Sequence, residues 1–271
     1  MATRRPAVAG QFYPGDPRHL REMVAGYMDD SRVEPAPERV AAIVAPHAGY
    51  IYSGPTAGYV YARIRGKKPK RVILVGCSHR YPIRRASVYE KGAFETPLAT
   101  FPVDEAFAST LAQELDSRSD DPHLLEHSLE VQLPFLHVSV GEVPIVPILF
   151  GAHAEAWHVD VGERLAAMVD SSDLVIASTD LSHYLSEEEA NRIDKHTIET
   201  VLTKDTATLG DGLRRGTCSM CGGAAVKMAM GFASACGATQ WSLLDYRTSG
   251  AVSRDYDRVV GYGAISMERE P

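Results

Sequence analysis

Short, almost continuous runs of apolar residues recur along the chain and are separated by segments with helical periodicity. Six of these runs predict β-strands: residues 40–45, 71–75, 143–150, 173–177, 239–246 and 259–266. The first four are apolar at nearly every position, which is typical of strands that are covered on both faces. Two prolines in the run at 143–150 indicate an edge strand or a bulge there.

The segments between these strands predict helices. Ser53-Gly54-Pro55 predicts a helix start, because proline is tolerated in the first turn. Further helices are predicted at residues 103–115, 154–169, 187–202 and 222–235. Strands that alternate with helices predict an α/β fold, here a three-layer α/β/α sandwich around a largely parallel or mixed central sheet. We expect residues 1–271 to form a single domain.

The composition excludes several classes of protein. The chain has 271 residues, of which 45% are hydrophobic and 23% charged, so it is globular rather than disordered. Its formal net charge of −7 disfavours nucleic acid as a partner. No apolar run reaches the ~18 residues of a membrane helix, and the N-terminus lacks the apolar core of a signal peptide. Four cysteines do not make a disulfide framework, so we expect a cytoplasmic protein without a membrane partner.

Polar residues with metal-binding or acid–base side chains follow the predicted strands. These residues are His47, His79, His153, Asp180 and His183. In an open α/β sheet, ligands bind outside the carboxyl ends of the strands, so parallel strands would bring these side chains to one edge. Any one of them has an ordinary alternative explanation: Asp180 as a helix cap and His153 as a residue at a helix start. The set as a whole favours a site built from His47, His79, Asp180 and His183.

Neutral imidazoles and a carboxylate are ligands that suit iron, zinc or copper. Two histidines with one anionic ligand and open positions are the arrangement of non-haem iron oxygenases. A further histidine, held away from the metal, would act as an acid or base near neutral pH.

The cysteines add one motif, Cys218-Ser219-Met220-Cys221, ahead of a glycine pair. A single CxxC is a weak signal for zinc or for redox chemistry, because no second CxxC is present and no strand precedes this one. Cys221 at the start of a predicted helix would nevertheless have a depressed pKa and could serve as a thiolate ligand. Cys77 and Cys236 are expected to be small buried hydrophobic residues.

Two further blocks predict residues that surround the pocket. In the segment 126–136 a helix would place His127 and Glu130 on one side, either solvated or facing the pocket behind the ligands. The segment 249–262, which contains Asp255, is dense in charged residues and tyrosines and is expected to be a loop that lines the pocket. Tyr50, close to His47 in the sequence, is assigned to the pocket as well.

The sequence resembles the Memo-like family, whose prokaryotic members are called AmmeMemoRadiSam system protein B. The blocks that carry the resemblance are RPAVAGQFYP, PHAGYIYSG, GCSH, EHSLEVQLPFL, STDLSHY and DRVVGYGA, in this order over nearly the whole chain. The resemblance implies a fold similar to that of class III (LigB-type) extradiol dioxygenases, which use non-haem Fe(II). It also implies a shared pathway with AMMECR1-like and radical-SAM proteins.

On this pattern, His47 and His79 look like the histidine ligands, and Cys221 stands where the dioxygenases place a glutamate. His183 looks like the acid/base histidine, with Asp180 beside the metal position. A thiolate is softer than a carboxylate and is easily oxidised, so catechol cleavage is not expected of this chain. The implied cofactor is iron or copper, with zinc as a further candidate, and no nucleotide cofactor is expected.

Three functions remain open from the sequence. The first is metal-dependent redox chemistry on an unknown small molecule or peptide. The second is a binding or accessory protein with a vestigial pocket, as animal relatives are described as adaptors that recognise phosphotyrosine peptides. The third is a metal-dependent hydrolase, which ranks last because neither GxSxG nor HExxH occurs in the sequence.

Overall fold

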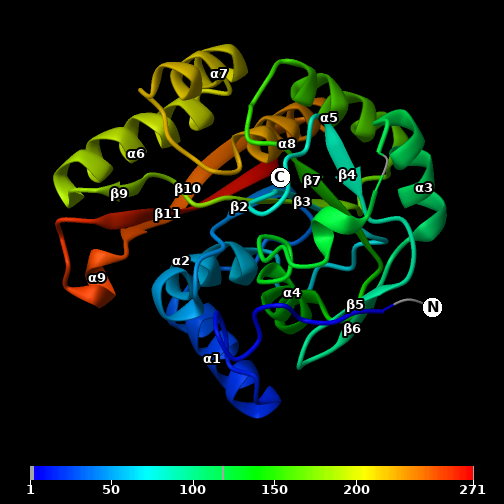
Figure 1. Cartoon of the computed structure of the whole chain (residues 1–271), viewed down its shortest axis with the longest axis horizontal. Coiled ribbons are helices and arrows are strands. Elements are labelled where there is room, and N and C mark those ends of the chain that lie inside the picture. Colours follow the sequence, from blue (N-terminus) through cyan, green and yellow to red (C-terminus); the bar gives the residue numbers. More distant parts are fainter. Residues whose placement is uncertain (1–2, 118, 271) are drawn as a thin grey trace.

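A mixed eight-stranded sheet forms the centre of the computed structural model, which describes residues 3–117 and 119–270. Figure 1 shows this sheet between two layers of helices. The strand order is β10-β11-β2-β8-β3-β7-β4, and β9 pairs with the first residues of β11. The fold is therefore the three-layer α/β/α sandwich that the alternation of strands and helices predicted.

Four parallel strands form the core of the sheet. They are β2 (Val40–Ala45), β8 (Leu174–Ser178), β3 (Val72–Cys77) and β7 (Ile145–Phe150). Every residue in them is buried, as their continuous apolar sequence predicted, because helices cover both faces. Their carboxyl ends lie at one edge of the sheet.

Antiparallel strands extend the sheet on both sides. On one side lie β11 (Val259–Arg269), β10 (Ala238–Thr248) and the short β9 (His183–Leu185). On the other side β4 (Ala86–Val88) pairs with β7. Pro147 of β7 therefore does not mark an edge strand, since β4 occupies the edge, and Pro144 precedes β7. The Pro147 carbonyl oxygen accepts a hydrogen bond from Tyr89 N, on the side of β4. Because the nitrogen and the carbonyl of a strand residue point to the same side, the Pro147 nitrogen, which has no N–H, also faces β4 rather than β3.

The helices form two layers. On one face lie α1 (Pro17–Asp30), α2 (Tyr50–Arg63) and α4 (Gln132–Val140). On the other lie α5 (Trp157–Met168) and α8 (Gly223–Ala235), with α6 (Glu187–Leu202) and α7 (Thr206–Arg215) beside them. The helix α3 (Glu105–Glu114) packs against β4 and β7. Figure 1 shows the two layers above and below the sheet.

Several details differ from the sequence-based predictions. Helix α2 begins at Tyr50 after Gly49, so Pro55 lies inside the helix and not at its start. Residues 126 and 127 have no regular structure, residues 128–131 form a turn, and the helix predicted over 126–136 begins at Gln132. The sequence analysis also missed α1, α7 and a small second sheet, which is built from β1 (Thr3–Arg4), β5 (Ala93–Glu95) and β6 (Thr100–Pro102). The polar connection between β10 and β11 contains one short helix, α9 (Gly250–Ser253).

Helices α5 and α8 approach each other so closely that glycine is required at their contact. A Cβ atom on Gly162 of α5 would overlap the carbonyl oxygen of Met228 and lie 2.6 Å from Phe232 N. A Cβ atom on Gly231 of α8 would in turn overlap the carbonyl oxygen of Val159. Because these neighbours are backbone atoms, they cannot move without separating the helices.

We expect Gly162→Ala to lower the free energy of unfolding by about 2–3 kcal/mol, since the added methyl group overpacks a backbone contact. Gly26→Ala in α1 is the matched control, because a Cβ atom there would meet no atom within 4 Å. This control should be neutral or stabilising by up to about 1 kcal/mol. Urea denaturation of both variants gives the comparison, and equal stabilities would show that the α5–α8 contact is more open than described.

No helix in residues 3–117 and 119–270 is both long and apolar enough to cross a membrane.

Candidate metal centre

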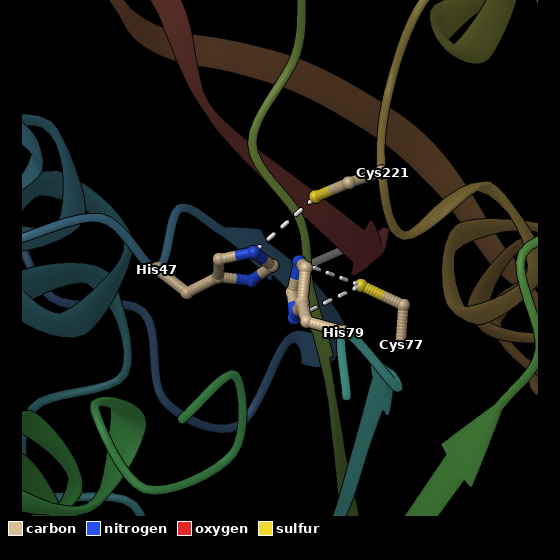
Figure 2. Close-up of side chains that lie close together, drawn as sticks. All are labelled: His47, Cys77, His79 and Cys221. Carbon is tan, nitrogen blue, oxygen red and sulfur yellow. Dashed lines mark hydrogen bonds between the residues drawn. The ribbon is translucent and has the colours of Figure 1, made fainter. Parts of the chain in front are cut away.

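Four metal-binding side chains meet at the carboxyl ends of the parallel strands. His47 lies two residues after β2, Cys77 ends β3, His79 follows it by two residues, and Cys221 lies just before α8. One donor atom from each lies within 4.8 Å of the donor atoms of the others. Figure 2 shows the two rings and the two sulfur atoms turned towards one another. A group that could bind a metal therefore lies at the edge of the sheet where the sequence predicted a site.

The ring of His47 is held in one orientation by hydrogen bonds. Its Nδ1 lies 2.9 Å from Ser178 Oγ. Ser178 has a single hydroxyl proton, which it donates to the Ser128 carbonyl at 2.6 Å, and it also accepts a bond from Gln132 Nε2. Ser178 must therefore accept from His47 Nδ1–H. In the neutral ring the lone pair is then on Nε2, which faces Cys221 Sγ at 3.2 Å.

His79 is oriented by the buried carboxylate of Glu126. Its Nδ1 lies 2.8 Å from Glu126 Oε1, and its backbone N–H donates to Oε2 at 2.7 Å. The bonds from His79 outweigh the effect of burial and lower the pKa of Glu126 to about 2, so this group is a carboxylate. His79 Nδ1 is then the donor, and Nε2 faces Cys77 Sγ at 3.5 Å. A carboxylate behind a histidine is a common way to orient a metal ligand.

The two sulfur atoms differ in protonation. A hydrogen bond from the Cys77 thiol lowers the pKa of Cys221 well below its ordinary value, and His47 and His79 lower it further against the effect of burial. The same bond, together with burial, raises the pKa of Cys77. The backbone N–H of Asp180 also donates to Cys221 Sγ at 3.3 Å. Of the two sulfur atoms, Cys221 therefore loses its proton first, and Cys77 keeps its proton as the hydrogen-bond donor.

The thiolate makes both histidine ligands basic. Burial disfavours the charged ring of His47, but Cys221 and Asp180 raise its pKa to about 9. Burial also disfavours the charged ring of His79, but its contacts with Cys221 and Glu126 raise its pKa to about 10. Without a metal, the centre at neutral pH holds two imidazolium rings around one thiolate.

His127 lies against this group without joining it. Its ring stacks on His79 with centroids 4.5 Å apart, and Phe12 covers it at 4.8 Å. Burial and the charge of His47 lower its pKa to about 4, so the ring is neutral at pH 7. Glu126 lies near enough to His79 and His127 for the three to form a second group of potential ligands. We assign Glu126 to orientation, because Oε1 already accepts bonds from His79 Nδ1 and from the backbone N–H groups of His127 and Ser128.

Asp180 and His183 lie beside the centre. The carboxylate of Asp180 is buried and its Oδ1 accepts the backbone N–H of His47 at 2.7 Å, so it holds the loop that carries this ligand. His183 Nδ1 lies 2.9 Å from the carbonyl oxygen of Leu181 and is therefore protonated, which leaves Nε2 as the acceptor of the neutral ring. Neither side chain belongs to the group of four.

Three residues that were assigned to the pocket lie elsewhere. Glu130 binds the N-terminal segment through Arg4, the backbone N–H groups of Ala7 and Val8, and the hydroxyl of Tyr13. The Tyr50 hydroxyl donates to the carbonyl oxygen of Val131 in the protein interior. Asp255 is exposed and its Oδ1 accepts the backbone N–H of Asp257 in the loop after α9. The nearby block 126–136 does contribute to the site, but through Glu126 and not through Glu130.

Three residues of the site were not predicted from the sequence: Cys77, Glu126 and Ser178. Cys77 is buried as expected, but its sulfur lies in the cluster. Its position two residues before His79 was a usable signal, since residues i and i+2 of an extended chain face the same side. Within the CxxC motif the sulfurs diverge, because Cys218 Sγ contacts Thr200 Oγ1 at 4.0 Å while Cys221 faces His47. All four cysteines are free.

A cavity of about 610 Å³ adjoins the centre. It is lined by His183, by Ser219, Met220 and Gly223 on either side of Cys221, and by residues of the loop before α5 and of α7. A larger cavity of about 1020 Å³ lies between residues 82–87 and Trp157, and none of the four clustered residues lines either cavity. We regard the smaller cavity as the approach to the centre because His183 lies in its wall.

Comparison with known proteins shows the family to which the chain belongs. The family model "Memo-like protein" matches residues 4–266. A MEMO1 family protein of Methanopyrus kandleri is 38% identical over 280 residues, which cover 98% of this chain and 99% of the relative. A second MEMO1 family protein, of Desulfurococcus amylolyticus, is 37% identical over 98% of this chain and 99% of the relative. The chain belongs to the Memo-like family.

Among solved structures, an uncharacterized protein from Escherichia coli K12 aligns with a TM-score of 0.49 at 14% sequence identity. The alignment covers 83% of this chain and 99% of that chain.

Proposed function

We propose that this protein binds one iron or copper ion through His47, His79 and Cys221 and uses it for redox chemistry on a small molecule. The observation that supports the proposal most directly is the group of two imidazoles and two sulfurs whose donor atoms lie within 4.8 Å of one another. Zinc would fit the same donors, but it has no redox chemistry of its own.

The chemistry of the donor set fits a transition metal. His47 and His79 both present Nε2 to the thiolate side, because Ser178 and Glu126 occupy their Nδ1 atoms. The ligands of a tetrahedral ion, with bonds of about 2.0–2.3 Å, are roughly 3.5 Å apart, so the side chains need only small shifts to bind one. Thiolate and imidazole ligands favour iron, copper or zinc over hard cations. Bound iron or copper would supply a one-electron redox couple.

The side chains beside the ligands have separate roles in this proposal. Asp180 holds the His47 loop through the backbone N–H and is a positioning residue. His183 lines the cavity, and because its Nδ1 is bound to the carbonyl oxygen of Leu181, Nε2 is the atom that would accept or return a proton of the substrate. Cys77, which was not among the expected ligands, would either give up its proton and bind the ion or remain a hydrogen-bond donor to Cys221.

The partners that the family resemblance implies, AMMECR1-like and radical-SAM proteins, are part of the proposal and rest on that resemblance alone. The limited volume of the cavity beside His183 favours a small molecule over a peptide as the substrate.

The proposal is tested by metal analysis of protein purified without oxygen. We expect about one iron or copper ion per chain in the parent protein, and a thiolate-to-metal charge-transfer band that reduction and reoxidation change reversibly. His47→Ala should lose the metal, and Cys221→Ser should lose the band. His196→Ala, which removes an exposed histidine of α6, is the matched control and should retain both.

Equal metal content in His47→Ala and the parent would refute the ligand assignment. A full complement of zinc with no redox-active metal would refute the proposed chemistry but leave the site in place.

A further inference from the structure

Two cysteine sulfurs lie close together in the candidate metal centre, and the proposed function requires only one of them. Cys77 Sγ and Cys221 Sγ are within 4.8 Å of each other. Cys77 ends β3 and Cys221 lies just before α8, so the fold brings together two sulfurs that are distant in the sequence. Figure 2 shows both sulfur atoms turned into the group. Neither is in a disulfide, so both can react.

The other two cysteines of the chain are not placed to pair with Cys221. Cys218 is three residues away, but it is buried and its Sγ lies against Thr200 Oγ1 at 4.0 Å, on a different side from Cys221 Sγ. Cys236 follows the last residue of α8, and a helix of 13 residues, about 20 Å long, separates it from Cys221. Cys77 is therefore the cysteine within reach of Cys221.

The backbones that carry the two sulfurs are neighbours of one short segment after β8. Val75 of β3 pairs with Ala177 of β8, so Cys77 lies beside the residues that follow β8. The backbone N–H of Cys221 donates to the carbonyl oxygen of Asp180, in that segment, at 3.2 Å. A disulfide needs its sulfurs about 2.05 Å apart, so the two atoms must approach by at most about 3 Å. Rotation of both side chains about χ1 supplies such a movement without breaking backbone hydrogen bonds.

Exposure determines which sulfur an oxidant meets first. The group is also open on the side of His79, whose side chain is 32% exposed. Cys221 is partly exposed, whereas Cys77 is only 3% exposed. A small oxidant therefore meets Cys221 first and finds Cys77 behind it. Cysteines that respond to oxidants often have such a second cysteine beside them, which resolves the first oxidation product.

We propose that Cys77 and Cys221 form a redox-active pair, which hydrogen peroxide converts into a disulfide when no metal is bound. The Cys221 thiolate attacks one oxygen of the peroxide: the S–O bond forms, the O–O bond breaks, and the hydroxide that leaves takes a proton from the solvent. Cys77 then attacks the sulfenic sulfur of Cys221, the S–S bond forms, and a second water leaves with the thiol proton of Cys77. Two electrons pass from the two sulfurs to the peroxide, which becomes two molecules of water.

The disulfide requires only the two cysteines, whereas its effect on metal binding rests on the proposed function. A bound ion would occupy Cys221 and protect it from the oxidant. In the metal-free protein the disulfide would remove this ligand until a thiol reductant restores it. Cys77 would also prevent the further oxidation of Cys221 to sulfinic acid, which thiol reductants do not reverse. The pair would therefore make the loss of the ligand reversible.

The test is peptide mass spectrometry of the full chain, after removal of metal with a chelator and treatment with a small excess of hydrogen peroxide. Cleavage after lysine and arginine places Cys77 in residues 72–80, and both Cys218 and Cys221 in residues 216–227. We expect these two peptides to be linked. Free thiols should fall from the four of the parent to about two per chain, and dithiothreitol should restore them. The same link in Cys218→Ser would identify Cys221 as the partner of Cys77.

Cys77→Ser should form no link, and its Cys221 should instead gain two oxygen atoms, a change that dithiothreitol does not reverse. Cys236→Ser is the matched control, since it removes a partly exposed cysteine at the other end of α8, and it should form the link as the parent does. Peroxide should also lower metal uptake by the parent at least tenfold. Dithiothreitol should restore this uptake in the parent but not in Cys77→Ser.

Two results would overturn the proposal. One is the absence of the linked peptides at a peroxide concentration that oxidises Cys221, and the other is a disulfide between Cys218 and Cys221 in place of the link. Both are read without metal, so a parent chain that takes up no metal before treatment contradicts the proposed function alone. Because the link is sought in the parent chain, the outcome stands even if Cys77→Ser does not fold.

Discussion

The affinity of the proposed centre for a metal ion should rise by up to about a hundredfold per pH unit between pH 6 and 8. In the metal-free centre the pKa of His47 is about 9 and that of His79 about 10, so both rings are protonated in this range. A metal ion must displace one proton from each Nε2, and every displaced proton contributes about tenfold per pH unit. Cys221 should contribute less, because the hydrogen bond from Cys77 and the two histidines hold its pKa well below its ordinary value. Competition with a chromogenic chelator at several pH values measures the slope.

Glu126→Gln provides the comparison. The variant removes the carboxylate that helps to raise the pKa of His79, so fewer protons should be displaced and the slope should be lower. The affinity itself should fall about 10–100-fold near pH 8, because the ligand loses its orienting partner. A parent protein whose affinity is flat between pH 6 and 8 would show that its rings are neutral before the metal binds.

Glu130→Gln should lower the free energy of unfolding by about 3–5 kcal/mol, the largest stability effect that we expect in this chain. Glu130 is fully buried, and its two oxygens accept bonds from Arg4 Nη1, Tyr13 Oη and two backbone N–H groups. The amide would leave Arg4 as an uncompensated charge and would turn one acceptor into a donor that faces other donors. Chemical denaturation monitored by circular dichroism measures the effect.

Asp29→Asn is the control for Glu130→Gln, since Asp29 forms an ion pair with Arg65 at 2.7 Å on the surface. With side chains 65% and 41% exposed, this pair should contribute at most about 1 kcal/mol. Similar losses in the two variants would contradict the assigned role of Glu130.

The apolar pattern was sufficient to predict the parallel core, because β2, β3, β7 and β8 are buried along their full length and their sequence is continuous in apolar residues. The apolar pattern did not predict the start of α2, which depends on a contact with a distant part of the chain. Pro55 lies inside α2 because the helix starts at Tyr50, whose backbone N–H is bound by the carbonyl oxygen of Phe12 from the distant N-terminal segment. A pattern confined to neighbouring residues contains no information about such a contact.

The candidate site was predictable to a similar extent. The positions of His47, His79 and Cys221 follow from strand ends and a helix start, and these positions are visible in the sequence. The choice between Glu126 and Glu130 was not predictable, because both follow the same pattern in the block 126–136. The difference lies in their partners: Arg4 engages Glu130 from the N-terminal segment, and His79 engages Glu126.

The donors of the centre are far apart along the chain, and His47 and Cys221 are 174 positions from each other. During synthesis the histidines and Cys77 emerge long before Cys221, so a growing chain cannot offer the full set of ligands until α8 has been made. An ion bound as proposed would tie the loops after β2 and β3 to the start of α8, so an ion bound early would stabilise only partial structures. Metal loading should therefore be a late event that follows the docking of α8 on the sheet.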